Sequence, residues 1–265
     1  MFMPPGGEPA SVSNDKRETA RQFGDAADAY FESAVHRDSP DLETLARWCT
    51  DADATRALDV ATGAGHTAGA LLAAGFDDVV ASDAAPAMVE TAVDAYGPTG
   101  VVADAERLPF CDAAFDAVTC RIAAHHFPDP ASFVDEAVRV LEPGGVLAFE
   151  DNVAPADPAL ADWLNGVERL RDPSHVALHS IAQWTDWFEA AGLRVDETET
   201  ASIILDFDDW VDRTNVPPDD LAELQRRFCD APPGAQDRFD VAFDAAGTVV
   251  SWANPKALIR ARLPA

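Results

Sequence analysis

Basic side chains are scarce in this sequence, and lysine is nearly absent. The 265 residues include 19 lysines and arginines against 47 aspartates and glutamates, which gives a formal net charge of −28. Only Lys16 and Lys256 are lysines. Such an acidic surface repels nucleic-acid phosphates and anionic lipid headgroups. We therefore expect no nucleic-acid partner and no membrane insertion.

Cysteines and long apolar runs are also few. The four cysteines lie far apart, with no CxxC pair and no histidine at the spacing of a zinc site: Cys49, Cys111, Cys120 and Cys229. No stretch approaches the roughly 18 apolar residues of a spanning helix, and the first residues lack the apolar core of a signal peptide. The sequence predicts reduced structural thiols, no metal site and a cytoplasmic location.

The acids are spread through periodic segments rather than gathered in one tail, which is typical of a folded acidic surface. Concentrated salt screens the self-repulsion of such a surface over a few ångströms. We hypothesise a salt-loving source organism.

The first 50 residues predict a leader and two helices. Residues 1–14 are rich in Pro, Gly and Ser and predict a disordered leader. Apolar residues at helical spacing predict helices over Glu18 to His36 and over Leu42 to Cys49. We interpret residues 15–50 as N-terminal lid helices.

Short apolar runs then alternate with helical stretches. They predict five buried strands, at residues 56–61, 78–83, 100–105, 115–121 and 145–151. Helices are predicted between them, at residues 65–74, 86–95 and 130–141, the last of them closed by "EPGG". Strands that alternate with helices form a parallel α/β sheet. Residues 51–152 are therefore predicted to be the core.

The alternation stops after Asn152. Residues 153–192 predict a helical cap insertion, two helices round a polar turn at Arg171 to Ser174. Residues 193–265 predict the last strands of the sheet with a second helical insertion. Within them we expect a strand at 193–205, two helices at 207–230 broken by Pro217 and Pro218, and a hairpin at 239–252.

The most informative stretch is "ALDVATGAGHTAGALL" at residues 57–72, a strand whose glycine turn opens into a helix. Gly63 and Gly65 allow the backbone to approach a ligand closely. A dinucleotide-binding turn has the pattern G-x-G-x-x-G, but Ala68 stands at the third glycine position. The turn therefore departs from that fingerprint.

The pattern D-x-A-x-G-x-G resembles motif I of the class I S-adenosylmethionine-dependent methyltransferases, with Asp59 as the acid and Ala61 in place of the first glycine. Three further matches follow in family order: "ASDAAPAMVETA" with Asp83, "ADAERLPFCDAAFDAVTC" with Asp104, and "RVLEPGGVLAFED". Over residues 16–265 the chain is similar to the ubiquinone/menaquinone-biosynthesis type (type 11) of small-molecule methyltransferase. It departs from the quinone enzymes at "CRIAAHHFPD".

This resemblance implies a fold and a cofactor. The fold would be a Rossmann-like, seven-stranded, mostly parallel sheet with a C-terminal antiparallel strand and helical cap insertions. The cofactor would be S-adenosyl-L-methionine, with S-adenosyl-L-homocysteine as product. By resemblance, Asp83 binds the ribose hydroxyls, Asp104 and the Ala105 N–H bind adenine, and Gly63 and Gly65 border the methionine portion. Ala61 belongs to the same cofactor-binding turn, and Asp59 organises the loop and faces the cofactor's amino group.

Further candidates for the site rest on residue type and position in the chain. Arg121, His125 and His126 follow the fourth strand, where an acceptor would lie, and a histidine titrates near neutral pH, so either histidine is a candidate base. Each histidine equally suits plain packing. Arg171 and His175 either contact the acceptor or hold the turn of the cap. Tyr30 either covers the adenosyl site or packs in the core.

We therefore expect a methyl transfer to a small-molecule acceptor by in-line displacement. Two alternatives stay open: an NAD(P)-dependent oxidoreductase on a similar fold, and a catalytically silent scaffold. The sequence does not identify the acceptor, the atom that is methylated or the oligomeric state.

Overall fold

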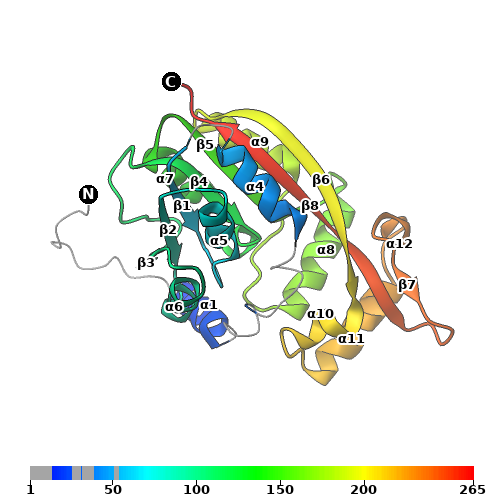
Figure 1. Ribbon diagram of the computed structural model, residues 1–265. Helices are drawn as coiled ribbons and strands as arrows, with labels where there is room; N and C mark the ends of the chain where they lie inside the picture. Colours follow the sequence, from blue (N-terminus) through cyan, green and yellow to red (C-terminus); the bar gives the residue numbers. More distant parts are fainter. Residues whose placement is uncertain (1–13, 26–30, 32–38, 51–53) are drawn as a thin grey trace.

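The computed structural model describes residues 14–25, 31, 39–50 and 54–265, and its centre is one twisted sheet (Figure 1). Seven strands follow the order β3-β2-β1-β4-β5-β8-β6, and a two-residue strand, β7, pairs with β8. The strands are β1 (Arg56–Val60), β2 (Asp78–Asp83), β3 (Thr99–Val102), β4 (Phe115–Arg121), β5 (Leu141–Asn152), β6 (Arg194–Asp206), β7 (Ala242–Phe243) and β8 (Val249–Arg262). In the seven-strand order, β8 runs antiparallel to its neighbours β5 and β6, and the remaining pairs are parallel. The predicted fold is confirmed.

Helices cover both faces of the sheet. One face carries α4 (Pro40–Thr50), α5 (His66–Ala73) and α6 (Pro86–Tyr96), and the other carries α7 (Pro130–Val140) and α9 (Ile181–Ala190). On the first face Trp48 and Leu71 pack in one buried cluster with β-strand residues such as Ala148, and on the second Phe133 and Trp184 pack with Phe149. Because helices cover both faces there, the central strands β1, β2 and β4 are nearly continuous runs of buried residues, whereas the edge strand β6 is largely exposed.

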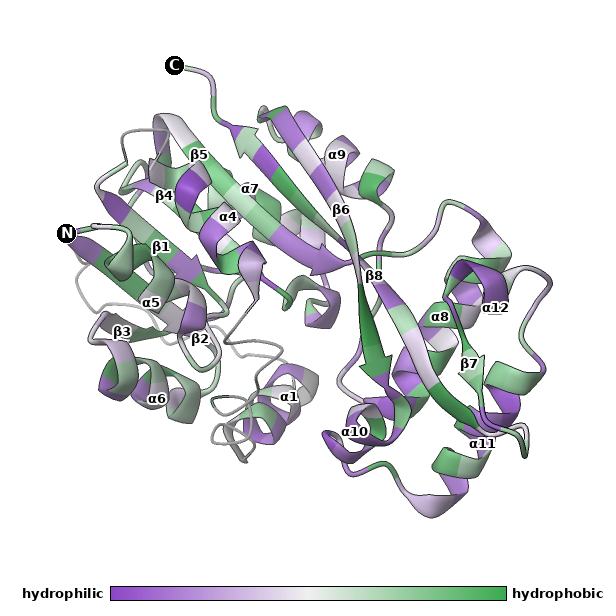
Figure 2. Cartoon of the chain, turned by 45° about the vertical axis from the view of Figure 1, so that its right-hand side comes forward, coloured by the Kyte–Doolittle hydropathy of each residue, from purple (hydrophilic) through white to green (hydrophobic). Residues whose placement is uncertain are grey.

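A third apolar cluster forms the cap. β6 and β8 are long strands, of 13 and 14 residues, and they run past the sheet into the cap. Phe207, Phe228 and Trp252 are fully buried there. Figure 2 shows the cap helices gathered round the far ends of these strands: α8 (Pro158–Arg171), α10 (Phe207–Asp212), α11 (Pro218–Cys229) and the short α12 (Ala235–Arg238).

Aspartates begin several of the helices. Asp129 accepts a hydrogen bond from the Ser132 N–H ahead of α7, and Asp157 accepts one from the Ala159 N–H ahead of α8. A proline follows each aspartate at the first helical position, where its missing N–H leaves no bond unmade. Part of the acidic composition therefore fixes where helices start.

Several helix and strand boundaries in the structure differ from those predicted. The helix predicted at 130–141 ends at Val140, and "EPGG" lies inside β5, because Leu141 already pairs with Phe115 of β4. The strand predicted at 100–105 is shorter, since β3 ends at Val102.

At the N-terminus α1 spans Asn14–Asp25, so Asn14 belongs to a helix and not to the leader. Residues 1–13 and the second half of the helix predicted over Glu18 to His36 lie outside the described residues, apart from Phe31.

The remaining predictions agree closely. The helices of the cap, the break at Pro217 and Pro218, and the hairpin between β7 and β8 all form as expected. Across the described ranges, no helix combines the length and the apolar character needed to cross a membrane.

Gly65 fixes the spacing of α5 and α6. A Cβ atom on Gly65 would lie 2.6 Å from the Ala92 Cβ atom of α6, and the residue has φ +89°. Both features require glycine.

We expect Gly65→Ala to lower the free energy of unfolding by roughly 2 to 4 kcal/mol, since it adds overpacking to left-handed strain. Gly63→Ala is the control, because φ there is also positive, +54°, but nothing lies within 4 Å of the added carbon. It should cost about 1 to 2 kcal/mol. Denaturant unfolding at constant salt measures both, and equal losses would contradict the role of helix spacing.

Candidate functional site

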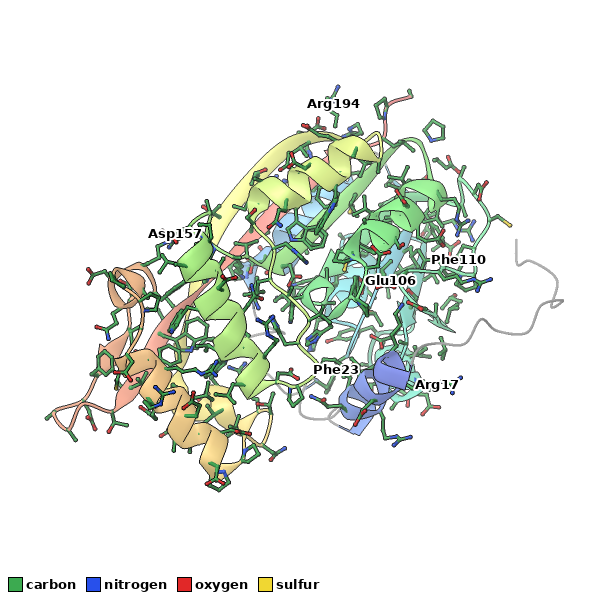
Figure 3. The ribbon with its side chains drawn as sticks, turned by 180° about the vertical axis from the view of Figure 1, so that it is seen from behind. Arg17, Phe23, Glu106, Phe110, Asp157 and Arg194 are labelled. Carbon is green, nitrogen blue, oxygen red and sulfur yellow. The ribbon has the colours of Figure 1, made fainter. Side chains whose placement is uncertain are left out.

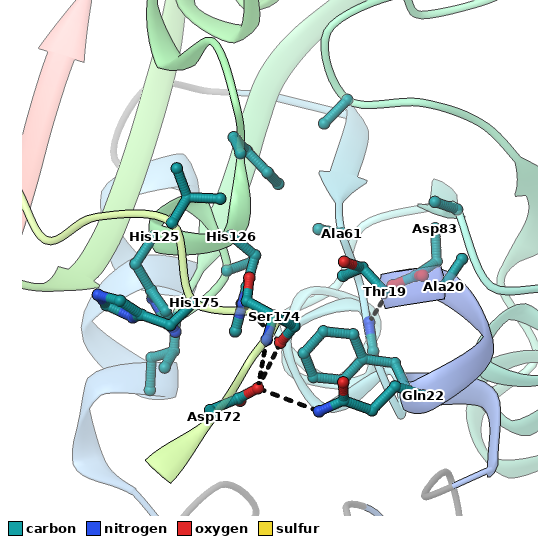
Figure 4. Close-up of a pocket in the computed structure, with 18 of the residues that line it drawn as sticks. Thr19, Ala20, Gln22, Ala61, Asp83, His125, His126, Asp172, Ser174 and His175 are labelled. Atoms are coloured by element: carbon teal, nitrogen blue, oxygen red, sulfur yellow. Dashed lines mark hydrogen bonds between the residues drawn. The ribbon is translucent and has the colours of Figure 1, made fainter. Parts of the chain in front are cut away.

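A pocket of about 640 Å³ opens at the carboxyl ends of β1, β2 and β4. The sheet forms one side of it, α1 covers it, and the cap closes the far end (Figure 4). In an open α/β sheet this edge is where ligands bind.

The turn after β1 borders the pocket with backbone rather than side chain. Ala61 and Gly63 both line the pocket, and both have positive φ, 52° and 54°. A left-handed alanine is strained, which explains why a glycine commonly occupies this place in motif I. A Cβ on Gly63 would meet nothing within 4 Å, so the turn leaves open space for a ligand.

Asp59 and Gly65 lie behind the turn, where Asp59 organises the loop as expected. Asp59 is 1 % exposed, and its carboxylate accepts hydrogen bonds from the hydroxyls of Thr62 at 2.6 Å and Thr119 at 2.7 Å. Burial raises the pKa of Asp59 to about 6, against the effect of these bonds. Neither Asp59 nor Gly65 is among the described residues that line the pocket. Asp59 holds the turn, and Gly65 brings two helices together.

Asp83 ends β2 and lines the pocket. Its carboxylate accepts hydrogen bonds from the backbone N–H of Gly63 and of Ala85, each at 2.9 Å. Burial raises the pKa of Asp83, although these N–H groups favour its charged form. The side chain thus joins the first glycine turn to the start of α6 and presents its edge to the pocket.

Asp104 lies after β3 and is bound by a lysine of α1. The Lys16 ammonium donates to both carboxylate oxygens of Asp104, at 2.8 and 2.9 Å, and to Glu106 at 2.5 Å. Burial lowers the pKa of Lys16, but its two carboxylate partners outweigh burial and raise it. On the inner side of the same helix, Phe23 packs edge-on against His126. The first turns of α1 are therefore fastened across the pocket (Figure 3).

The other end of the pocket is polar and basic. His125 and His126 lie in η1 (Ala124–His126), directly after β4, and His175 lies after α8. Figure 4 shows these three side chains facing Asp83 and Ala61 across the pocket. Arg121 also lines the pocket, and its Nε donates to the buried Glu150 at 2.9 Å.

Arg171, at the end of α8, completes this lining from the cap. Its Nε donates to the Trp210 carbonyl oxygen at 3.0 Å, and its guanidinium lies 5.2 Å from the centre of the Trp210 ring. The substrate candidates of the cap and the catalytic candidates after β4 are thus brought together.

Comparison with known proteins identifies the family of this chain. Residues 58–149 match the family model described as a methyltransferase domain. The chain is 33 % identical over 244 residues to an uncharacterized methyltransferase, YcgJ, of Bacillus subtilis, an alignment that covers 90 % of this chain and 96 % of YcgJ. The chain belongs to the methyltransferase family.

Solved structures show the same fold for this methyltransferase. A protein of Bacillus halodurans that is provisionally assigned as a methyltransferase is 37 % identical, with a TM-score of 0.78 over 83 % of this chain and 99 % of that one. The crystal structure of YcgJ gives 32 % identity and the same TM-score, over 84 % and 98 % of the two chains. A demethylmenaquinone methyltransferase of Clavibacter sepedonicus is 29 % identical, over 69 % of this chain and 85 % of that protein.

Most predicted site residues of the methyltransferase line this one pocket: Ala61, Gly63, Asp83, Asp104, Ala105, Arg121, His125, His126, Arg171 and His175. Asp59 and Gly65 are the exceptions described above. Tyr30 lies outside the described residues. Within the described part of the chain, no group of three or more histidine, cysteine or acidic side chains is arranged to hold a metal ion.

Sequence reasoning missed four residues that shape the site: Lys16, Asp151, Glu168 and Asn254. Asp151 ends β5 as Asp83 ends β2, so the strand-end pattern that identified Asp83 also applied to it. Lys16 is one of two lysines, and that scarcity was a signal. Glu168 and Asn254 carry no such signal, because their places depend on how the cap folds over the sheet.

The Lys16 ion pair predicts how firmly α1 is held. In Lys16→Gln we expect the amides of residues 14–25 to exchange with deuterium faster, by roughly three- to tenfold, because a partly exposed ion pair contributes about 1 kcal/mol. Mass spectrometry of the peptide covering α1 measures this.

Arg17→Gln is the matched control. Arg17 is exposed on the outer side of the same helix (Figure 3), and the variant removes the same charge. Equal acceleration in both variants would mean that net charge, and not the Lys16 contact with Asp104, holds the helix.

Proposed function

We propose that this protein is an S-adenosylmethionine-dependent methyltransferase that acts on a small-molecule acceptor. The observation that carries the proposal is the continuity of the pocket, in which the motif residues of the sheet and the polar side chains of the cap line one space. A cofactor and an acceptor bound next to each other in one pocket can be held in the orientation that a direct transfer requires.

The lining fits an adenosyl cofactor at the sheet end. We propose that Asp83 accepts hydrogen bonds from the two ribose hydroxyls, since its carboxylate lies at the pocket edge beside the open space at Gly63. In the same proposal, Asp104 accepts a hydrogen bond from the adenine amino group and Ala105 donates its N–H. Asp104 must then share its oxygens between Lys16 and the adenine.

The cofactor, when bound, supplies a methyl group on a sulfonium that is already activated for displacement. The protein has to align the acceptor in line with that methyl group and to exclude water. Phe23 of α1 and Trp210 of the cap both line the pocket and supply apolar surface for this purpose. A small-molecule acceptor agrees with the enclosed volume, and a net charge of −28 disfavours a nucleic acid.

Calorimetric titration of S-adenosylhomocysteine and S-adenosylmethionine tests the proposal, with NAD as a competing ligand. The wild type should bind the first two, and Asp83→Asn should bind them roughly 100-fold more weakly, because two hydrogen bonds to a charged carboxylate are lost.

Asp94→Asn is the matched control. Asp94 is an exposed residue of α6, so the variant carries the same charge change away from the pocket. Binding of NAD without either sulfur ligand would instead favour an oxidoreductase.

A further inference from the structure

Three histidine rings gather at the acceptor end of the pocket. The ring centre of His125 lies 4.1 Å from that of His126 and 5.7 Å from that of His175. All three line the pocket (Figure 4). Adjacent rings of this kind compete for any proton, so their partners decide which ring can hold one.

The partners of the three rings differ in charge. The Nδ1 atom of His126 lies 3.0 Å from the Ser174 carbonyl oxygen, and the Nε2 atom of His175 lies 3.0 Å from the Asn165 side-chain oxygen. The Nδ1 atom of His125 lies 2.6 Å from a carboxylate oxygen of Asp151. Two rings are thus bonded to neutral atoms and one to a charge.

These surroundings shift the pKa values of the three rings in different directions. Burial, with the neighbouring His125, lowers the pKa of His126 to about 3, and burial with both other rings lowers the pKa of His175 to about 2. Burial also lowers the pKa of His125, but Asp151 outweighs it and raises the pKa above its ordinary value. His125 is therefore the ring suited to take a proton.

Asp151 also fixes which nitrogen of His125 faces the pocket. Asp151 is 1 % exposed at the end of β5, and the same oxygen accepts from the Asn152 N–H at 2.8 Å. A carboxylate accepts hydrogen bonds, so the Nδ1 atom of His125 carries the proton and donates it. The Nε2 atom is then left with its lone pair, and no described residue bonds to it.

We propose that His125 is the general base of this enzyme, that Asp151 is its positioning residue, and that the methyl acceptor is a hydroxyl compound. This proposal rests on the proposed methyl transfer. In the step, the O–H bond of the acceptor breaks and its proton moves to Nε2 of His125. The acceptor oxygen forms the new O–C bond, and the C–S bond breaks with its electron pair remaining on sulfur.

A hydroxyl acceptor is the class that we infer from such a base. A thiolate or an uncharged amine attacks a methyl sulfonium without help, whereas a hydroxyl is a weak nucleophile until its proton leaves. The carboxylates around His125 favour its protonated form: Asp151 from β5, Glu168 from α8, and Asp172 from the segment after α8. The two neutral rings, His126 and His175, complete its surroundings.

Asn254 supplies an independent indication of a ligand that donates a hydrogen bond. This residue of β8 lines the pocket and is 6 % exposed, and its amide nitrogen donates to Glu168 at 3.4 Å. Its side-chain oxygen is buried and has no hydrogen-bond partner among the described residues. A buried acceptor without a partner is costly. A donor group of the ligand, such as a second hydroxyl, would satisfy it.

Nitrogen NMR of protein labelled at histidine tests the dyad without any acceptor. In the wild type the neutral ring of His125, assigned from His125→Gln, should carry its proton on Nδ1, and it should titrate above the ordinary range for histidine. Asp151→Asn should lower this pKa and move part of the proton to Nε2, because the carboxylate is gone.

Asp186→Asn is the control, an exposed aspartate of α9 with the same charge change. A wild-type ring protonated mainly on Nε2 would overturn the dyad. So would a tautomer and titration that Asp151→Asn leaves unchanged.

Activity with defined probes tests the acceptor class. Catechol is the hydroxyl probe, and benzenethiol and aniline are its sulfur and nitrogen counterparts, with release of S-adenosylhomocysteine as the readout. Methylation of catechol should rise with pH as His125 loses its proton, and His125→Gln should lower kcat by roughly 10²- to 10⁴-fold with cofactor binding unchanged. Asp151→Asn should lower kcat less.

Methylation of the thiol or amine alone, or of no probe while the cofactor binds, overturns the hydroxyl class. Catechol methylation that His125→Gln leaves unchanged overturns the base. Failure of the wild type to bind cofactor in calorimetry would instead count against the proposed function, and the NMR result would still decide the dyad.

Discussion

A chain of four charged side chains under the pocket ties the sheet together. Arg121 of β4 donates to Glu150 of β5, and Lys256 of β8 donates to Glu150 at 3.1 Å and to Asp41 of α4. Glu150 is fully buried, and removing either cation would take away one of the two charges that compensate it. The site depends on this network, because Arg121 leads into the turn with His125, and the residue after Glu150 is Asp151.

Because lysine is so scarce, each of the two lysines has a large role in holding distant segments together. Each one joins segments that lie far apart in the chain: Lys16 reaches Asp104 across 88 positions, and Lys256 reaches Asp41 across 215. Acidic residues are abundant everywhere, so the position of the rare ammonium group decides which acids become paired. The acidic composition thus does more than keep the surface hydrated, since it supplies the partners that hold α1 at the pocket and α4 against β8.

The fold and the cofactor end of the site were largely predictable from the sequence, because they depend on local patterns. Strand-sized apolar runs and a glycine turn place Gly63 and Asp83 at one sheet edge whatever the cap does. The position of Asp59 and Gly65 behind the turn was not predictable, since a motif does not reveal which side of a turn a residue faces. The acceptor end was found only in part, because Glu168 and Asn254 meet through tertiary packing of α8 against β8.

The continuous strands β6 and β8 have a consequence for how this protein unfolds and diversifies. The two strands stay paired from Arg194 with Arg262 in the sheet to Asp206 with Ser251 in the cap. No linker separates the cap from the sheet along these strands. The cap therefore cannot unfold without breaking part of a hydrogen-bond ladder that it shares with the sheet. The cap is therefore not an exchangeable module. Selectivity among acceptors would evolve by single substitutions on the inner faces of its helices.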